Sequence, residues 1–376
     1  MTHTIKTVHA PHKTNKRRIH ELDFLRGFFI LVIIIDHLQR WPSPLSYLTG
    51  EGRLWVSAAE GFFIISGLLI GYLRGYKGLK IPMRNLTGML VRRAAKLYIW
   101  SIIITLIAVF IMQHAHYDAS LMPKLPETSG LAYLWQVITQ QYVFDWIYFL
   151  RLYWMMLLAA PLAILAFRAG KWWLVPAVSI AIYALSFTIY QPEAAMQWQV
   201  LFFLAATIGW HFEKIVDFIR AHPVIRLVMT SSLILITFIT MVVSYFWVLG
   251  WDSVESGRAH LSRDSYVATR SWLDLWFTKD PLAIGRVLLS FIWFGGLLAL
   301  MHWLKTFIER YARWLLTPLG TYSLTSYTIQ AIILLPFQIF IPVTNSTFIN
   351  TLIAIAAVIL VRYLTTQRHM HRLLPQ

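Results

Sequence analysis

The stretch that decides the fold is LDFLRGFFILVIIIDHL, at residues 22–38. It is apolar enough, and just long enough, to cross a bilayer as a helix. It also carries four ionisable residues: Asp23, Arg26, Asp36 and His37. Because a charge near the bilayer centre costs about 2.5–3.5 kcal/mol on insertion scales, such residues are usually kept for function. The stretch is therefore predicted to be a transmembrane helix with a functional polar face.

Arg26 and His37 are eleven positions apart. At about 100° per residue that is close to a whole number of turns, so both side chains leave one face of the helix. A rise of about 1.5 Å per residue separates them by about 16 Å along the axis. A fixed cation at one depth and a titratable imidazole at another suit a catalyst that works across the membrane.

The amino-acid composition also indicates a membrane protein. The chain has 376 residues, of which 58% are hydrophobic and 13% are charged. A soluble protein of this length carries about twice that share of charge, so we expect an integral membrane protein. The net charge of +16 does not indicate nucleic-acid binding, because the basic residues cluster between apolar spans, as orientation signals do. With no cysteine, the chain has no disulfide and no thiol nucleophile.

The predicted fold is an all-α polytopic membrane protein with about ten transmembrane helices. Residues 1–21 are predicted to be a cytoplasmic basic tail, residues 22–366 one transmembrane domain, and residues 367–376 a second cytoplasmic tail. The distribution of Lys and Arg places both termini in the cytoplasm. The expected spans are 22–38, 55–73, 91–112, 147–167, 172–190, 198–212, 224–250, 282–304, 315–338 and 347–364.

His37 and Arg26 are the first catalytic candidates. Imidazole can take or give a proton near neutral pH, although an interfacial histidine can also simply be satisfied by water. Glu60 is expected at the same depth on the next span, where its carboxylate would accept the other ring N–H of His37 and fix the tautomer. Arg26 could neutralise a phosphate or stabilise an oxyanion. The alternative for Arg26 is a local ion pair with Asp23, three residues earlier.

Two further groups are candidates for binding a donor. Ser66 and Gly67 allow close approach of a ligand or of another helix, and plain helix packing stays open. Arg92 and Arg93 could hold the phosphates of a cytoplasmic acyl donor. They could equally bind anionic lipid headgroups, or only follow the positive-inside rule.

An acceptor site is predicted on the outer side. Aromatic faces with amide and carboxylate partners suit sugar binding, but they also describe an ordinary interfacial aromatic belt. The candidates are Asp36, Asp145, Tyr153, Trp198 and Gln199. No metal site is predicted, since His114 and His116 lack carboxylates at ligand spacing.

Several motifs resemble a known family. LDFLRG, the Arg26–His37 spacing, AAEGFFIISGLLIG and VRRAAKLY are similar to the membrane acyltransferase type 3 superfamily. Other blocks resemble its OpgC-like branch, which is typified by succinyl transfer to osmoregulated periplasmic glucans. These blocks are LRLYWMMLLAAPL at 150–162, QPEAAMQWQVLFFLAATIGW at 191–210, KDPLAIGRVLLSF at 279–291 and LTPLGTYSLTSY at 316–327.

The resemblance implies an O-acyltransferase of the bacterial inner membrane. Such an enzyme moves a succinyl or acetyl group from cytoplasmic acyl-coenzyme A to a hydroxyl of an extracytoplasmic glycan of the cell envelope. Arg26 and His37 match the functional pair of the family, and Glu60 matches its acidic position. Arg92 and Arg93 match the basic residues that meet the coenzyme. Acyl-coenzyme A would be a co-substrate, with no permanently bound cofactor, and the other partners would be the carbohydrate acceptor and membrane lipids.

Two other functions are weighed against this one. Intramembrane Arg, Asp and His could form the proton relay of a transporter or flippase for a glycan or lipid-linked precursor. Transporters of this kind often show inverted repeats and matching broken helices, and the sequence shows neither. A distantly similar membrane family transfers acetyl groups to the nitrogen of an amino sugar, and the acceptor atom would distinguish it.

Overall fold

The computed structural model describes residues 19–115 and 122–375, and this part of the chain is helical with no β-strand. Most of the predicted N-terminal tail, and His116, lie outside the described residues. All ten predicted spans overlap helices. These are α1 (His20–Leu38), α3 (Ala58–Leu69) with η2 (Ile70–Tyr76), α4 (Met83–Gln113), α6 (Tyr148–Arg168), α7 (Leu174–Ser186), α8 (Ala194–Trp210), α10 (Pro223–Leu249), α13 (Ile284–Trp303), α15 (Arg313–Thr321) with α16 (Ser323–Phe340), and α17 (Thr347–Thr365).

Seven of the described helical segments are long and apolar enough to cross a membrane. Helices α7 and α8 are apolar but shorter. Helix α1 has 19 residues, but four acidic or basic side chains lower its apolar character: Glu21, Asp23, Arg26 and Asp36. The protein is thus an all-helical membrane protein, while the count of ten spans and the side of each terminus stay predictions.

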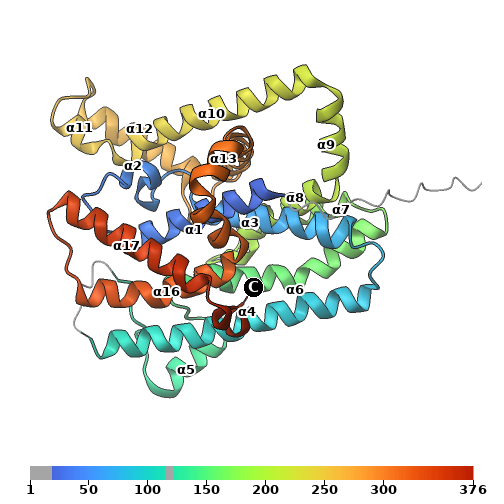
Figure 1. Cartoon of the computed structure of the whole chain (residues 1–376), viewed down its shortest axis with the longest axis horizontal. Coiled ribbons are helices and arrows are strands. Elements are labelled where there is room, and N and C mark those ends of the chain that lie inside the picture. The colour runs from blue at the N-terminus through green and yellow to red at the C-terminus, as the bar shows by residue number, and fades with distance from the viewer. Residues whose placement is uncertain (1–18, 116–121, 376) are drawn as a thin grey trace, which may run out of the picture.

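Helix α1 is the centre of the bundle. It packs against α3, α13, α15, α16 and α17. Figure 1 shows it between α10 and α13 on one side and α4 and α6 on the other. Its apolar side chains are buried on several faces, and inside a bilayer this burial acts through close packing against the neighbouring helices. Residues on α1 are therefore fixed in position by most of the fold.

Glycines set two close helix contacts. A Cβ atom on Gly27 of α1 would lie 2.1 Å from the carbonyl oxygen of Leu316 in α15. On Gly67 of α3 it would lie 2.0 Å from the carbonyl oxygen of Phe202 in α8. At these two points only glycine lets the backbones approach so closely.

Two sequence expectations about secondary structure are corrected. The span expected at 315–338 is two helices, because the chain bends at Tyr322 (φ −111°, ψ 40°) between α15 and α16. The expected spans leave residues 251–280 as a connection between spans, yet this segment contains α11 (Trp251–Glu255) and α12 (Arg263–Phe277), and α12 packs on α13. Ser262 begins α12, since its hydroxyl accepts a hydrogen bond from the Ser265 amide at 3.2 Å.

The short elements lie mainly between the spans. They are α2 (Ser46–Thr49), η1 (Gly50–Gly52), α5 (Gly130–Ile138), η4 (Asp145–Ile147), α9 (Phe212–Ala221), α14 (Lys305–Phe307), η5 (Ile308–Ala312) and α18 (Arg368–Leu373). The chain after α17 folds back on the bundle: Lys96 Nζ of α4 donates to the Leu374 carbonyl at 2.8 Å, and Thr325 of α16 donates to the Pro375 carbonyl at 2.7 Å.

Candidate active site

His37 lies in the last turn of α1 and is held on two sides. Its Nδ1 is 3.2 Å from Oε1 of Gln330 in α16. Its ring stacks on Trp146, with centroids 5.6 Å apart and planes 12° apart. Because an amide oxygen only accepts hydrogen bonds, this pairing places the proton on Nδ1 and leaves a lone pair on Nε2. The half-buried imidazole is therefore oriented to accept a proton through Nε2.

The ends of α1 and α16 hold one another at the same place. Gln338 Nε2 donates to the Leu38 carbonyl at 2.6 Å. In return, the buried Arg40 guanidinium donates to the carbonyls of Phe337 and Ile341 at the end of α16. The Leu38 and Ile341 carbonyls lie at helix ends, where the last carbonyls have no partner within the helix. Both contacts fix the turn that carries His37 relative to Gln330.

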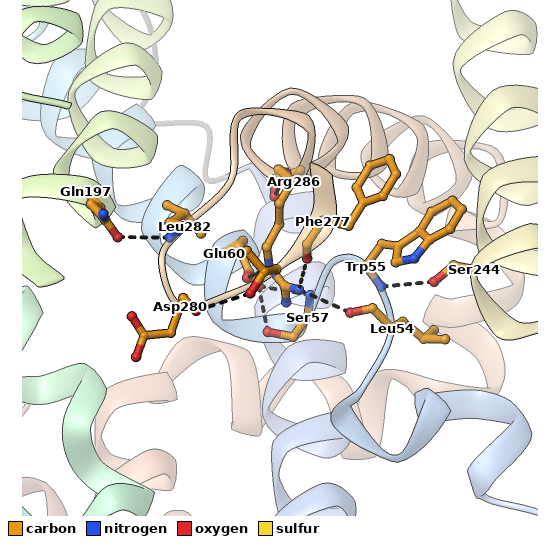
Figure 2. Close-up of polar contacts among 12 residues, drawn as sticks. Leu54, Trp55, Ser57, Glu60, Gln197, Ser244, Phe277, Asp280, Leu282 and Arg286 are labelled. Carbon is orange, nitrogen blue, oxygen red and sulfur yellow. Dashed lines mark hydrogen bonds and ion pairs between the residues drawn. The ribbon is translucent and has the colours of Figure 1, made fainter. Parts of the chain in front are cut away.

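Glu60 has other hydrogen-bond partners than the sequence suggested. Its Oε1 is 2.6 Å from Nε of Arg286 in α13, and its Oε2 accepts hydrogen bonds from the backbone N–H and hydroxyl of Ser57 at 2.9 and 2.6 Å. Glu60 is 0% exposed and Arg286 is 4% exposed. Figure 2 shows the three residues turned toward one another. The prediction that Glu60 accepts the second N–H of His37 is wrong. The carboxylate of Glu60 bonds to Arg286 and Ser57, and Nδ1 of His37 pairs with Gln330.

The guanidinium of Arg286 is also fixed by backbone. Its Nη1 donates to the carbonyl of Phe277 at 3.1 Å and to that of Leu54 at 3.4 Å (Figure 2). The buried ion pair thus ties α3 and α13 to the end of α12. Its many bonds are typical of a structural ion pair, and a catalytic role for Glu60 stays a prediction.

Arg26 is half-buried, three turns before His37 on the same unbroken helix. The continuity of α1 keeps the two side chains on one face, as the spacing predicted. Their separation along the helix remains about 16 Å. The two residues therefore serve different depths of the bundle and do not act on one atom.

The basic pair in α4 has unequal surroundings. Arg92 is exposed, whereas Arg93 is half-buried with its guanidinium carbon 5.8 Å from the ring centroid of Tyr153. Arg74 lies close enough to interact electrostatically with both Arg93 and Tyr153. Tyr153 is 2% exposed. Tyr153 thus lies beside one of the arginines expected to meet the donor, and its role in an acceptor site stays a prediction.

Three other candidates are used in helix packing. Ser66 is buried in α3, and Gly67 is the close contact with Phe202 described above. Gln199 accepts a hydrogen bond from the Ser179 hydroxyl and donates to the Ser179 carbonyl, both at 2.7 Å, which joins α7 to α8. The structure therefore favours the packing alternative for Gly67. It shows Gln199 in a helix interface, and a role of Gln199 in acceptor binding stays a prediction.

The remaining acceptor candidates are spread around the His37 end of α1. Asp145 is exposed and directly precedes Trp146, the residue that stacks on His37. Trp198 is 7% exposed, and Lys279 Nζ lies 5.8 Å from its ring centroid. Asp36 lines a separate cavity of about 60 Å³ between α1, α3, α10 and α13. Asp145 thus adjoins the residue that stacks on His37, Trp198 lies beside Lys279, and Asp36 lines a different cavity.

Sequence reasoning missed Arg286, Gln330, Trp146 and Lys279. Arg286 lies within the expected span 282–304, so the rule that selected Arg26 applies to it equally. Gln330 is an amide among apolar residues of the expected span 315–338. Trp146 lies in the short helix η4 and Lys279 in the loop after α12, outside the expected spans. Nothing in their sequence context indicated that Trp146 would contact His37 or that Lys279 would interact with it electrostatically.

Comparison with known proteins supports a single assignment. The OpgC protein family model matches residues 18–369, which is nearly the whole chain. No curated protein and no solved structure matches it. The match runs from before α1 to within α18, so it includes His37, Gln330 and the Glu60–Arg286 pair. The chain belongs to the OpgC protein family.

Proposed function

We propose that this protein is a membrane O-acyltransferase. It moves an acyl group, succinyl or acetyl, from cytoplasmic acyl-coenzyme A to a hydroxyl of an extracytoplasmic glycan in the bacterial inner membrane. At the level of the family, membership indicates an acyltransferase-like membrane enzyme that modifies glucans. The observation that carries the proposal is the oriented imidazole of His37, held through Nδ1 by Gln330 with Nε2 left as a base.

The proposed chemistry uses that base directly. His37 Nε2 takes the proton of the acceptor hydroxyl while the hydroxyl oxygen attacks the thioester carbonyl carbon. The tetrahedral intermediate then collapses, the carbon–sulfur bond breaks, and the leaving thiolate takes the proton from His37. The products are an ester on the glycan and free coenzyme A.

The two ends of the site are proposed to serve the two substrates. Arg93, with Arg74 nearby, supports binding of the coenzyme phosphates, because a guanidinium suits bidentate contact with phosphate. The exposed Asp145, next to the residue that stacks on His37, supports a sugar acceptor, since a carboxylate matches sugar hydroxyls. Arg26, which stays protonated, would neutralise negative charge on the donor.

The test uses the purified protein in proteoliposomes. These receive acyl-coenzyme A with a labelled succinyl or acetyl group and a linear or cyclic glucan. We expect free thiol to appear together with labelled ester on the glucan, measured by mass spectrometry of the glucan. Movement of glucan across the bilayer with no labelled ester and no free thiol would overturn the proposal in favour of a transporter.

A further inference from the structure

The loop between α12 and α13 is fixed by neighbouring helices. Tyr183 of α7 donates its hydroxyl to the Leu282 carbonyl at 2.7 Å. Gln197 of α8 accepts from the Leu282 amide at 2.9 Å, as Figure 2 shows. Within the loop, the Thr278 hydroxyl donates to the Asp280 carbonyl at 3.2 Å. Because buried side chains hold both sides of one residue, the loop is a rigid support for the side chain it presents.

That side chain is Lys279. It keeps exposed surface, and its ammonium lies 5.8 Å from the ring centroid of Trp198. It is within electrostatic range of four charged or titratable residues on the packed helices: Asp36 and His37 of α1, Glu60 of α3 and Arg286 of α13. Lys279 is thus a cation within electrostatic range of the base that the proposed reaction uses.

Lys279 forms no ion pair within the described residues. In residues 19–115 and 122–375, no carboxylate oxygen lies within 4 Å of its ammonium, and the nearby carboxylate of Glu60 is taken by Arg286 at 2.6 Å. Although the side chain keeps some exposed surface, the surrounding helices displace water from the ammonium and lower the pKa of Lys279. Arg286 lowers this pKa further, and Glu60 and Asp36 oppose the change.

Three arginines of this region already have partners. Arg286 is bound to Glu60 and two backbone carbonyls. Arg40 is bound to the end of α16. Arg151 makes two hydrogen bonds to the Glu193 carboxylate, at 2.9 and 2.7 Å. Lys279 therefore differs from these arginines in having a charge available for a ligand.

We propose that Lys279 stabilises the oxyanion that forms during acyl transfer at His37, an inference that rests on the proposed function. When the acceptor oxygen attacks the thioester, the electron pair of the carbonyl double bond moves onto its oxygen. The Lys279 ammonium donates a hydrogen bond to that oxygen and keeps its own proton throughout, while His37 carries the proton from acceptor to thiolate. A cation in place before the reaction stabilises this charge more than water can.

The test compares Lys279→Met with Lys279→Arg in the full-length protein in proteoliposomes. Loss of one such donor lowers kcat by about 100-fold to 1,000-fold, so we expect a fall of that size in Lys279→Met with little change in KM for the glucan. Lys279→Arg keeps the charge and should retain activity within about tenfold. Lys171→Met removes an exposed lysine between α6 and α7 and serves as the matched control.

The pH profile supplies a readout that a structural role would not move. Because the pKa of Lys279 is lowered, kcat should fall on the alkaline side below the usual titration range of lysine. In Lys279→Arg this alkaline limb should move to higher pH, since a guanidinium stays protonated. The melting temperature of each variant in detergent confirms that the protein is folded.

The outcomes separate the two proposals. Full kcat in a folded Lys279→Met protein, with labelled ester still formed by the unaltered enzyme, would overturn the role of Lys279 alone. So would equal loss in the folded Met and Arg variants. Absence of acyl transfer by the unaltered enzyme would overturn the proposed function and this inference together.

Discussion

Two polar centres lie within electrostatic range of Lys279, and they differ in how many of their atoms are already bonded. The Glu60–Arg286 pair is buried, and its carboxylate and guanidinium contact Ser57, Leu54 and Phe277 as well as each other. His37 is half-buried and uses only Nδ1 and its ring face.

This difference shows how to distinguish a structural ion pair from a catalytic side chain in this fold. A buried charged pair with all of its partners present contributes rigidity, and removing one partner leaves an uncompensated charge. A histidine with one nitrogen held and the other available has the arrangement that proton transfer needs. Variants at the two centres should therefore fail in different ways, the first in stability and the second in activity.

The largest expected effect is that of His37→Ala. Loss of the general base should lower kcat by about 100-fold to 10,000-fold, because proton transfer from the hydroxyl then has no positioned acceptor. The melting temperature should change little, since the half-buried ring contributes only one side-chain hydrogen bond. Coenzyme A release measured by thiol titration checks the first expectation. Unchanged turnover in a folded His37→Ala protein would remove the proposed mechanism.

Glu60→Gln should instead act on stability. It leaves Arg286 buried without its counter-charge, a change that costs about 3–5 kcal/mol in buried pairs. Thermal unfolding in detergent measures it. The matched control is Arg263→Ala, which breaks the exposed 3.1 Å pair with Glu255 and should cost about 0–1 kcal/mol. A stable but inactive Glu60→Gln protein would contradict the comparison and restore the catalytic role expected from the sequence.

Gln330→Leu tests whether the partner of His37 positions the ring. Loss of a hydrogen-bond partner that orients a histidine typically lowers activity by about 10-fold to 100-fold, and we expect Gln330→Leu to lower kcat in that range. Gln330→Glu keeps an oxygen that accepts from Nδ1 and should recover most of the activity. If both variants lose the same amount of activity, the bond to Gln330 does not set the tautomer.

Gly67→Ala is expected to have the smallest effect of this series. The added Cβ would lie 2.0 Å from the Phe202 carbonyl oxygen, so α3 and α8 must separate, at a cost of about 1–3 kcal/mol. Gly88→Ala in α4 is the control, because nothing lies within 4 Å of a Cβ added there. The difference in melting temperature between the two variants measures the close contact, and equal values would contradict it.

The sequence predicted more of the fold than of the site. Uninterrupted apolar stretches located helices at all ten expected spans, because backbone groups in a bilayer must bond within their own segment. The break at Tyr322 and helix α12 escaped this reasoning, since hydropathy does not distinguish a bent helix from a straight one, or an amphipathic helix from a polar loop.

For the site, the sequence identified single residues but paired them incorrectly. His37 and Arg26 follow from the rarity of charge in an apolar span and from helical periodicity. The pairing of His37 with Glu60 rested on depth alone, and depth does not fix which face of a neighbouring helix a side chain leaves. The actual partners are Arg286 for Glu60 and Gln330 for His37. Each lies more than 200 positions from its partner in the chain.

By itself, the sequence determined that this chain is a helical membrane protein whose first span carries a cation and an imidazole on one face. Periodicity and hydropathy are local properties, so they can be read without knowing the neighbours. Only the tertiary structure decided that Gln330 bonds to His37, that Arg286 bonds to Glu60, and that the fixed loop brings Lys279 within electrostatic range of both. Each of these contacts joins segments far apart in the chain, and their meeting depends on how the helices pack around α1.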